Sequence, residues 1–270
     1  PGQRVAANVE TFCGECYFCK RGFVNNCVTG GWELGCRIDG CQTEYVRVPY
    51  ADNGLTVIPD SLEYEDVIMI SCILPSGYFG AELAEIKPGD VVVVLGAGPV
   101  GCTTMMCARL FGPAFIVAVD VIDERLEFAK RHGWCDVTVN PGKEDLDAVV
   151  KGLTDGRGAD SVIEVAGGKD TFETAWKVAR PNGIVSLIAM YEEAQSLPLH
   201  LMYGKNLTFK TGGVDASHND TLMKLIEGGK INCRPLITHT MPLNDIMHGY
   251  DIFEHHLDGC VKVAITPYER

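Results

Sequence analysis

Basic residues are scarce in this chain of 270 residues: 23 lysines and arginines stand against 36 aspartates and glutamates, and the formal net charge is −13. Because nucleic acids and anionic membrane surfaces repel a protein of this charge, the composition argues against both as partners. Long apolar runs are missing too, since none approaches the roughly 20 residues that a membrane-spanning helix needs, and no signal peptide is visible. We therefore expect a soluble protein without a membrane or nucleic-acid partner.

Apolar residues are plentiful, at 46% of the sequence. A length of 270 residues exceeds what one compact domain usually needs, so we expect two domains. The chain opens on proline rather than methionine, and residues 1–5 are typical of a turn that leads into a strand. This start indicates the middle of a longer protein.

Cysteine is abundant, with 12 residues. Four of them follow the spacing C-x2-C-x2-C-x7-C: Cys13, Cys16, Cys19 and Cys27. Four thiolates close one tetrahedral zinc shell and leave no position for substrate, which is typical of a structural site. The alternatives are incidental core thiols or a pair of disulfides, but such short spacings are awkward for disulfide pairing and nothing else suggests secretion.

The remaining cysteines show no clear metal-ligand pattern. Cys36 and Cys41 flank a glycine-rich turn, and we interpret them as incidental. Most of the others lie in apolar surroundings, where cysteine behaves as a small hydrophobe; they include Cys102, Cys107, Cys135, Cys233 and Cys260. A reducing cytoplasm is the simplest compartment for such a chain.

A glycine-rich turn follows the apolar run Val91–Leu95, which predicts a buried parallel strand. The turn reads Gly96-Ala97-Gly98-Pro99-Val100-Gly101 and fits G-x-G-x-x-G, with an apolar helical pattern after it. Glycine at the first position allows a tight turn, at the second the approach of a pyrophosphate, and at the third close packing of helix on strand. The helix N-terminus then offers free N–H groups to the phosphates.

An acidic residue stands where a dinucleotide fold needs one. The apolar run Phe115–Val119 predicts the next strand, and Asp120 follows it directly. A carboxylate there accepts hydrogen bonds from a ribose 2′-hydroxyl and repels a 2′-phosphate, so the pattern favours NAD over NADP. A solvated strand-end carboxylate is the alternative, and Asp123 could share the role.

Strands and helices alternate beyond Asp120. The predicted helices are 124–131, 145–153 and 170–179, and the predicted strands are 136–139, 161–164, 184–188 and 207–211. Six strands separated by crossovers indicate an α/β fold with a doubly wound parallel sheet. The strand ends at Val165-Ala166-Gly167 and at Ala189-Met190 are expected near the point where dinucleotides bind.

The residues together resemble the zinc-dependent medium-chain dehydrogenases, the family that includes alcohol dehydrogenases. The resemblance covers nearly the whole chain and is carried by the four-cysteine lobe, the GAGPVG turn and the segments at 1–5, 43–49, 72–78, 87–90 and 258–263. It implies a Rossmann coenzyme domain at 74–212 and a partial GroES-like, β-rich catalytic domain. That domain would comprise 1–73, with the zinc lobe, and the return segment 213–270.

The resemblance also implies a second, catalytic zinc with three protein ligands. Two of them would lie upstream of Pro1, and the third falls on Cys72, for which the residues alone favour a buried inert thiol. Ser76 would touch the nicotinamide end of the cofactor. Arg125 would reach the adenosine ribose, although a solvated helix position is an equal alternative.

The expected activity is reversible oxidation of a primary or secondary alcohol to an aldehyde or ketone with NAD. A related formaldehyde, threonine or polyol dehydrogenase is one alternative, and a non-catalytic fragment that binds zinc and NAD is another. The 270-residue chain alone would then be inactive, because two catalytic zinc ligands are missing. By analogy with the family, we expect a homo-oligomer that pairs through the strand at 207–211.

Overall fold

The computed structural model describes residues 1–268, and the chain divides into two units. One unit combines Pro1–Pro75 with the segment that begins at Val214, and the other is Ser76–Gly213. The second unit is therefore inserted in the sequence of the first.

The inserted unit is built on a parallel sheet of six strands in the order β10-β9-β8-β5-β6-β7. The strands are β5 (Val91–Leu95), β6 (Phe115–Val119), β7 (Val137–Val139), β8 (Ala159–Glu164), β9 (Ala179–Leu187) and β10 (Thr208–Thr211). The strand order reverses between β5 and β8, which is the switch point of a doubly wound fold and confirms the predicted fold class. β10 lies at one edge and pairs only with β9 among the described strands.

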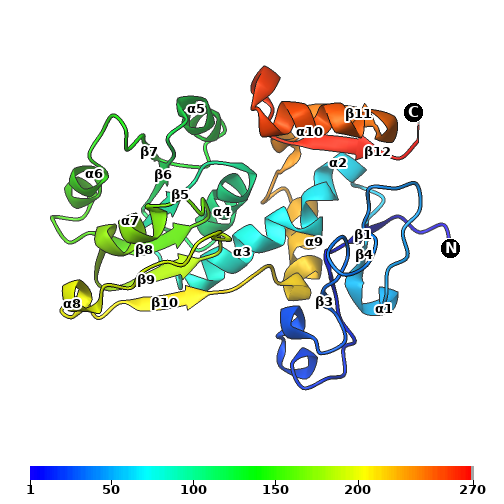
Figure 1. Ribbon diagram of the computed structural model, residues 1–270, viewed down its shortest axis with the longest axis horizontal. Helices are drawn as coiled ribbons and strands as arrows, with labels where there is room; N and C mark the ends of the chain where they lie inside the picture. Colours follow the sequence, from blue (N-terminus) through cyan, green and yellow to red (C-terminus); the bar gives the residue numbers. More distant parts are fainter. Residues whose placement is uncertain (269–270) are drawn as a thin grey trace. The chain divides into compact units, whose positions relative to one another are not determined.

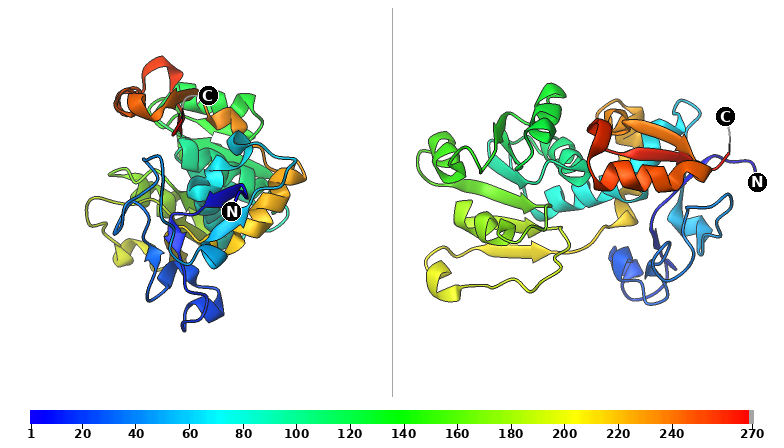
Figure 2. Two further views of the ribbon diagram at one scale, coloured as in Figure 1. Left: turned by 90° about the vertical axis from the view of Figure 1, so that its right-hand side faces the viewer. Right: turned by 45° about the horizontal axis from the view of Figure 1, so that its top comes forward.

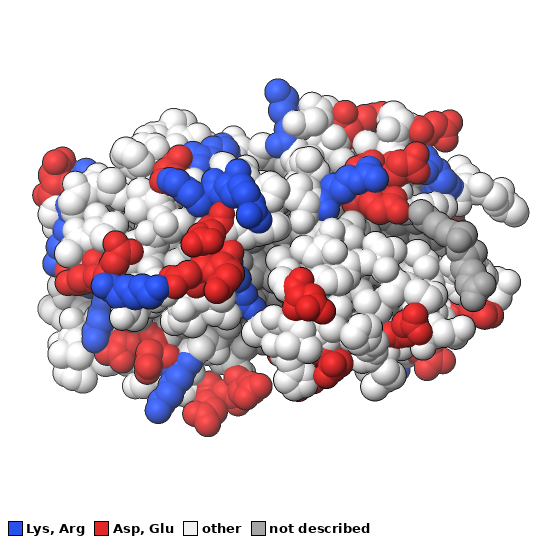
Figure 3. All heavy atoms as spheres, turned by 90° about the horizontal axis from the view of Figure 1, so that it is seen from above, with Lys and Arg blue, Asp and Glu red and all other residues white. Residues whose placement is uncertain are grey.

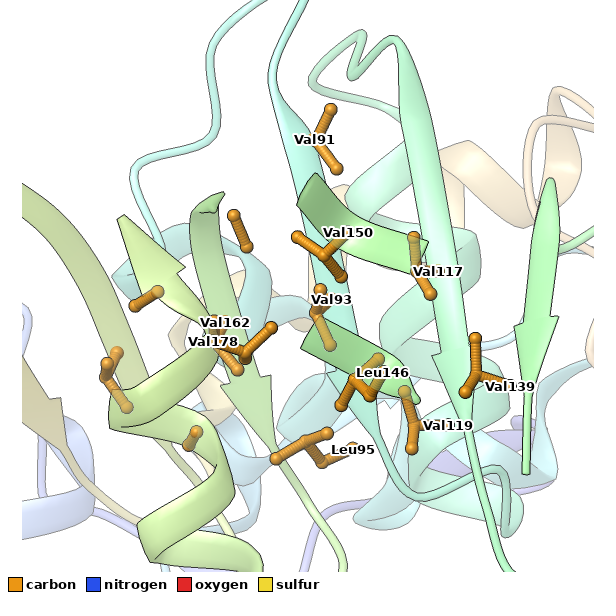
Figure 4. Close-up of a cluster of buried hydrophobic side chains, with 14 residues drawn as sticks. Val91, Val93, Leu95, Val117, Val119, Val139, Leu146, Val150, Val162 and Val178 are labelled. Carbon is orange, nitrogen blue, oxygen red and sulfur yellow. The ribbon is translucent and has the colours of Figure 1, made fainter. Parts of the chain in front are cut away.

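Helices cover both faces of this sheet (Figure 1). They are α3 (Ile73–Leu83), α4 (Pro99–Arg109), α5 (Asp123–Arg131), α6 (Leu146–Leu153), α7 (Thr171–Val178) and the short α8 (Leu199–Met202). Figure 4 shows one layer of the core, where side chains of α6 and α7 meet alternate residues of the strands, such as Val93 and Val162. Ile163 points the other way and lies against Gly80 of α3. A sheet buried on both faces explains why its strands read as continuous apolar runs.

The unit formed by Pro1–Pro75 and the segment that begins at Val214, called the outer unit because the other is inserted in its sequence, has short elements. Its strands form three pairs: β1 (Val5–Ala7) with β4 (Leu55–Val57), β2 (Glu10–Thr11) with β3 (Gly31–Trp32), and β11 (His239–Pro242) with β12 (Val263–Thr266). Its α-helices are α1 (Ala51–Gly54), α2 (Tyr64–Val67), α9 (Asn219–Glu227) and α10 (Ile246–Glu254). Figure 2 shows α10 lying along the β11–β12 pair, which it contacts.

Acidic and basic side chains lie interspersed on the face shown in Figure 3. Within residues 1–268 no single helix is long and apolar enough to cross a membrane. One bent pair, Tyr64–Ser71 followed by Ile73–Leu83, reaches that threshold together, by length and composition only.

Candidate dinucleotide and metal sites

The glycine turn is shaped by two close backbone approaches. Gly96 has a φ of +107°, and its N–H donates to the carbonyl of Val119 at 2.7 Å, which ties the turn to the end of β6. A Cβ on Gly101 would lie 1.9 Å from the carbonyl oxygen of Gly96. Both positions therefore exclude a side chain for reasons internal to the protein.

Gly98 is open where the other two glycines are crowded. An added Cβ would find only the Arg125 guanidinium, at 4.0 Å. The helix α4 begins just after it, with Pro99 and Val100 in its first turn, so the first N–H groups of the helix lack partners within the helix. This space, beside free N–H groups and a guanidinium, suits a pyrophosphate.

Asp120 is held against the glycine turn itself. Its Oδ2 accepts a hydrogen bond from the N–H of Ala97 at 2.8 Å, and its Oδ1 accepts one from the N–H of Ile122 at 3.0 Å. Arg125 Nη1 lies 3.8 Å from the same Oδ2. Each carboxylate oxygen keeps a second lone pair for a ribose hydroxyl. The sequence indicated the carboxylate but not its hydrogen bond to Ala97.

Asp123, the second acidic position considered, is engaged elsewhere. Its carboxylate pairs with the ammonium of Lys143 and accepts a hydrogen bond from Asn140 Nδ2 at 2.8 Å. The hydrogen bond from Lys143, and then the one from Asn140, keeps the pKa of Asp123 below its usual value. These residues line a hollow of about 650 Å³ beside α5. Asp120, rather than Asp123, thus stands next to the glycine turn.

The carboxyl ends of β8 and β9 meet the turn from the other side. A Cβ on Gly96 would lie 3.2 Å from Ala166, and one on Gly101 would lie 3.5 Å from Val165. A Cβ on Gly167 would come within 2.6 Å of the Met190 carbonyl oxygen and 3.4 Å of Ala189. The strand-end residues singled out in the sequence therefore lie together at the carboxyl end of the sheet. Ala166, which continues the strand end at Val165, lies with them.

The sequence did not single out Glu164, the last residue of β8, as a candidate site residue. It is fully buried, and its carboxylate accepts hydrogen bonds from two backbone N–H groups and a tyrosine hydroxyl. The only sequence signal is an acidic residue at the end of an apolar strand, directly before Val165-Ala166-Gly167.

The four cysteines of the lobe converge as their spacing predicts. The sulfur atoms of Cys13, Cys16, Cys19 and Cys27 all lie within 4.8 Å of one another. Zinc–sulfur bonds of about 2.3 Å in a tetrahedron place sulfurs about 3.8 Å apart, and the Cys13–Cys19 and Cys16–Cys19 separations are 4.0 and 3.4 Å. No disulfide occurs among the described cysteines. The donor set fits a zinc ion.

Backbone N–H groups donate hydrogen bonds to the sulfur atoms of this cluster. The N–H groups of Cys13, Cys16 and Cys19 donate to sulfurs of the cluster at 3.4, 3.4 and 3.5 Å. The N–H of Cys19 is the main cause that lowers the pKa of Cys16 to about 6. Burial, followed by the hydrogen bond shared with Cys16, raises the pKa of Cys19 to about 12. The thiolates thus form unequally until a metal neutralises them.

Cys72 belongs to no such cluster. It caps the 3-10 turn Ile68–Ser71 and is partly exposed, and the described residues place no two further metal ligands beside it. Burial lowers the pKa of Lys262, and the neighbouring Cys72 and Cys260 offset part of that shift. Ser76, in α3, is buried. One thiol cannot hold a catalytic zinc by itself.

A doubly wound sheet with a phosphate-binding turn and a four-thiolate metal lobe defines a class of zinc-containing, dinucleotide-binding proteins. Two family models match this chain: "Alcohol dehydrogenase GroES-like domain" over residues 1–60 and "Zinc-binding dehydrogenase" over residues 99–227. The chain belongs to the zinc-dependent medium-chain dehydrogenase family, as its sequence motifs predicted.

Individual relatives agree with that assignment. An alcohol dehydrogenase from Cupriavidus necator is 39% identical over 246 residues, which are 89% of this chain and 66% of the relative. An NADP-dependent isopropanol dehydrogenase from Clostridium beijerinckii is 31% identical, over 95% of this chain and 74% of its own length. The solved alcohol dehydrogenase of Thermus sp. ATN1 superimposes with a TM-score of 0.90 at 31% identity and covers 98% of this chain. This chain covers 78% of that structure, and just under two thirds of the Cupriavidus protein.

Proposed function

We propose that this chain is part of an NAD-dependent alcohol dehydrogenase that interconverts a primary or secondary alcohol and its aldehyde or ketone. The observation that carries the proposal is the position of Asp120. Its carboxylate closes the glycine turn through Ala97 and retains lone pairs for the ribose 2′-hydroxyl. A 2′-phosphate at the same position would meet a negative charge.

The inserted unit supplies the parts that hold a dinucleotide. Gly98 and the start of α4 receive the pyrophosphate, and Asp120 with Arg125 receives the adenosine ribose. Val165, Ala189 and Met190, at the ends of β8 and β9, line the nicotinamide half. When bound, NAD supplies a ring that accepts a hydride from the alcohol carbon or returns it to a carbonyl.

The proposal includes two zinc ions with different roles. The four-cysteine cluster holds one structural ion, which stiffens a lobe with little core of its own. Cys72 contributes one ligand to a catalytic ion, but the described residues do not complete that site.

A second candidate is a zinc- and NAD-binding role without catalysis. It is favoured because no group of three metal ligands that includes Cys72 occurs among residues 1–268, and a catalytic zinc needs such an open three-ligand shell. The substrate stays open as well: a formaldehyde, threonine or polyol dehydrogenase is compatible with the same site. Turnover of ethanol, isopropanol, threonine and sorbitol by the purified protein with NAD separates these possibilities.

The cofactor choice is tested by Asp120→Gly. Loss of the carboxylate removes the ribose acceptor and the repulsion of a 2′-phosphate, so the ratio of NAD affinity to NADP affinity should fall about tenfold or more. Absolute NAD affinity should also fall, because the hydrogen bond to Ala97 is lost. Dissociation constants are measured by titration of intrinsic fluorescence.

The matched control is Asp123→Gly, which removes a carboxylate engaged with Lys143 and Asn140. It should leave the NAD/NADP ratio unchanged. An unaltered ratio in Asp120→Gly, or an equal change in both variants, would refute the assignment of NAD selectivity to Asp120.

A further inference from the structure

Glu164 is a fully buried carboxylate near the middle of the sheet. It ends β8, where it pairs with Leu95 of β5 on one side and Leu187 of β9 on the other. Its Oε1 accepts hydrogen bonds from the N–H groups of Ala166 and Gly167, both at 2.9 Å. Its Oε2 accepts one from the Tyr191 hydroxyl at 2.6 Å. Three donors on an acceptor-only group fit an ionised carboxylate.

Tyr191 keeps its proton in this arrangement. Burial, and then the hydrogen bond to Glu164, raise the pKa of the Tyr191 hydroxyl above its usual value. The tyrosine hydroxyl therefore remains the donor of the hydrogen bond to Glu164 Oε2. None of the ion pairs within residues 1–268 includes Glu164, so dipoles rather than a cation stabilise its charge.

The charge lies in the half of the sheet that faces nicotinamide. In a doubly wound dinucleotide fold, one mononucleotide half binds adenosine and the other binds nicotinamide, with both ligand halves at the carboxyl ends of the strands. β5 and β6 carry the glycine turn and Asp120, which leaves β8, β9 and β10 for the nicotinamide half. The peptide groups that bind Glu164 belong to the segment packed on Gly96 and on Met190.

We propose that Glu164 makes this site prefer the oxidised cofactor, by placing a buried negative charge near the ring that is cationic in NAD⁺ and neutral in NADH. The inference rests on the proposed NAD site. Attraction between a buried anion and a cationic ring is only weakly screened, and it acts on one redox state alone. The same carboxylate fixes the backbone of Ala166 and Gly167, so its charge and its hydrogen bonds need separate tests.

The first test is Glu164→Gln, studied by titration of the purified protein with NAD⁺, NADH and ADP-ribose. Glutamine keeps the shape, its oxygen accepts from both N–H groups, and its amide can donate to Tyr191, whose hydroxyl then accepts. We expect NAD⁺ to bind about five- to tenfold more weakly, with NADH and ADP-ribose changed less than about twofold. ADP-ribose has no nicotinamide ring and therefore reports on the shape of the rest of the site.

The second test is Tyr191→Phe, which removes one donor and leaves the charge. The preference for NAD⁺ over NADH should be kept or increase, even if both bind more weakly. The control is Glu173→Gln on the exposed face of α7, where a carboxylate paired with Lys177 is screened by water. It should leave all three affinities unchanged.

Several outcomes would overturn the proposal. Equal loss of NAD⁺, NADH and ADP-ribose in Glu164→Gln would mean that Glu164 only holds the backbone. A lost NAD⁺ preference in Tyr191→Phe would assign the effect to the hydrogen bonds rather than the charge. Failure of the wild-type protein to bind any of the three ligands would instead refute the proposed NAD site, and the inference with it.

Discussion

Glu10 is a second buried carboxylate, and it lies in the outer unit. Its Oε2 accepts a hydrogen bond from the N–H of Ala216 at 2.8 Å, which joins β2 to the return segment of the chain. Asn8 lies next to it and accepts from the Glu10 N–H at 2.9 Å. Burial, assisted by the charge of Asp215, raises the pKa of Glu10 to about 8 against the pull of the Ala216 N–H. Folding therefore keeps a proton on Glu10 at neutral pH.

This proton makes stability depend on pH. The unfolded chain releases it near the ordinary pKa of 4.5, whereas the folded protein holds it to about pH 8. Between these values the folded state binds more protons, so the free energy of unfolding contributed by this site falls as pH rises. Glu10→Gln removes the dependence and should stabilise the protein by up to roughly 4 kcal/mol at pH 7.5.

Urea unfolding from pH 5 to 8.5 measures this difference. The exposed substitution Glu44→Gln is the control and should reproduce the wild-type profile. If the Glu10→Gln and wild-type curves run parallel across the range, burial of Glu10 has no such effect.

At the scale of elements, substitutions at Gly98 and Gly101 of the glycine turn should affect binding and folding separately. The φ of Gly98 is −72°, and an added Cβ meets only the Arg125 side chain at 4.0 Å, so Gly98→Ala should fold normally. The methyl group would occupy the approach of the pyrophosphate, and NAD should bind at least about tenfold more weakly. Gly101→Ala would force a Cβ to 1.9 Å from the Gly96 carbonyl, and it should cost about 2–3 kcal/mol of stability.

Urea unfolding and NAD titration of both variants measure the two effects. Gly152→Ala on α6 is a useful control, because a Cβ there meets no atom within 4 Å. It should stabilise the helix by about 1 kcal/mol without changing NAD affinity. Wild-type NAD affinity in Gly98→Ala would contradict the placement of the pyrophosphate.

The sequence predicted elements best where one physical cause determined them. β5 and β6 occupy the predicted residues, because strands buried on both faces need unbroken apolar runs. β9 begins at Ala179 rather than at Ile184, since its first part includes Pro181 and Asn182 and pairs with β8 through a register shift. Proline and asparagine are depleted in strands, so these residues carry no strand signal. Pairing with the neighbouring strand holds them extended.

In the candidate site too, features within one local segment could be predicted from the sequence, and contacts between distant segments could not. Ligand spacing alone predicted the four-cysteine cluster, because all its members lie in one loop. The hydrogen bonds of Asp120 to Ala97 and of Glu164 to Tyr191 join residues from different segments. No local pattern encodes such contacts, which arise only when parallel strands bring their carboxyl ends to one edge.

At the scale of the whole molecule, metal and dinucleotide belong to different units. All four cysteines of the cluster lie in the outer unit, and the glycine turn with Asp120 lies in the inserted one. Loss of structural zinc should therefore disturb the lobe and leave NAD binding largely intact. We expect about one zinc per wild-type chain and close to none in Cys13→Ala, with NAD affinity within about twofold of wild type.

Elemental analysis of the purified proteins, combined with NAD titration, measures both quantities. Cys36→Ala, at an exposed cysteine outside the cluster, should retain its zinc. Equal zinc in wild type and Cys13→Ala would reject the lobe as the binding site. About two zinc ions per wild-type chain would mean that Cys72 gains partners within this chain, and alcohol turnover by the protein as it stands should then follow. About one zinc would mean that the lobe alone is filled and that Cys72 holds no second ion.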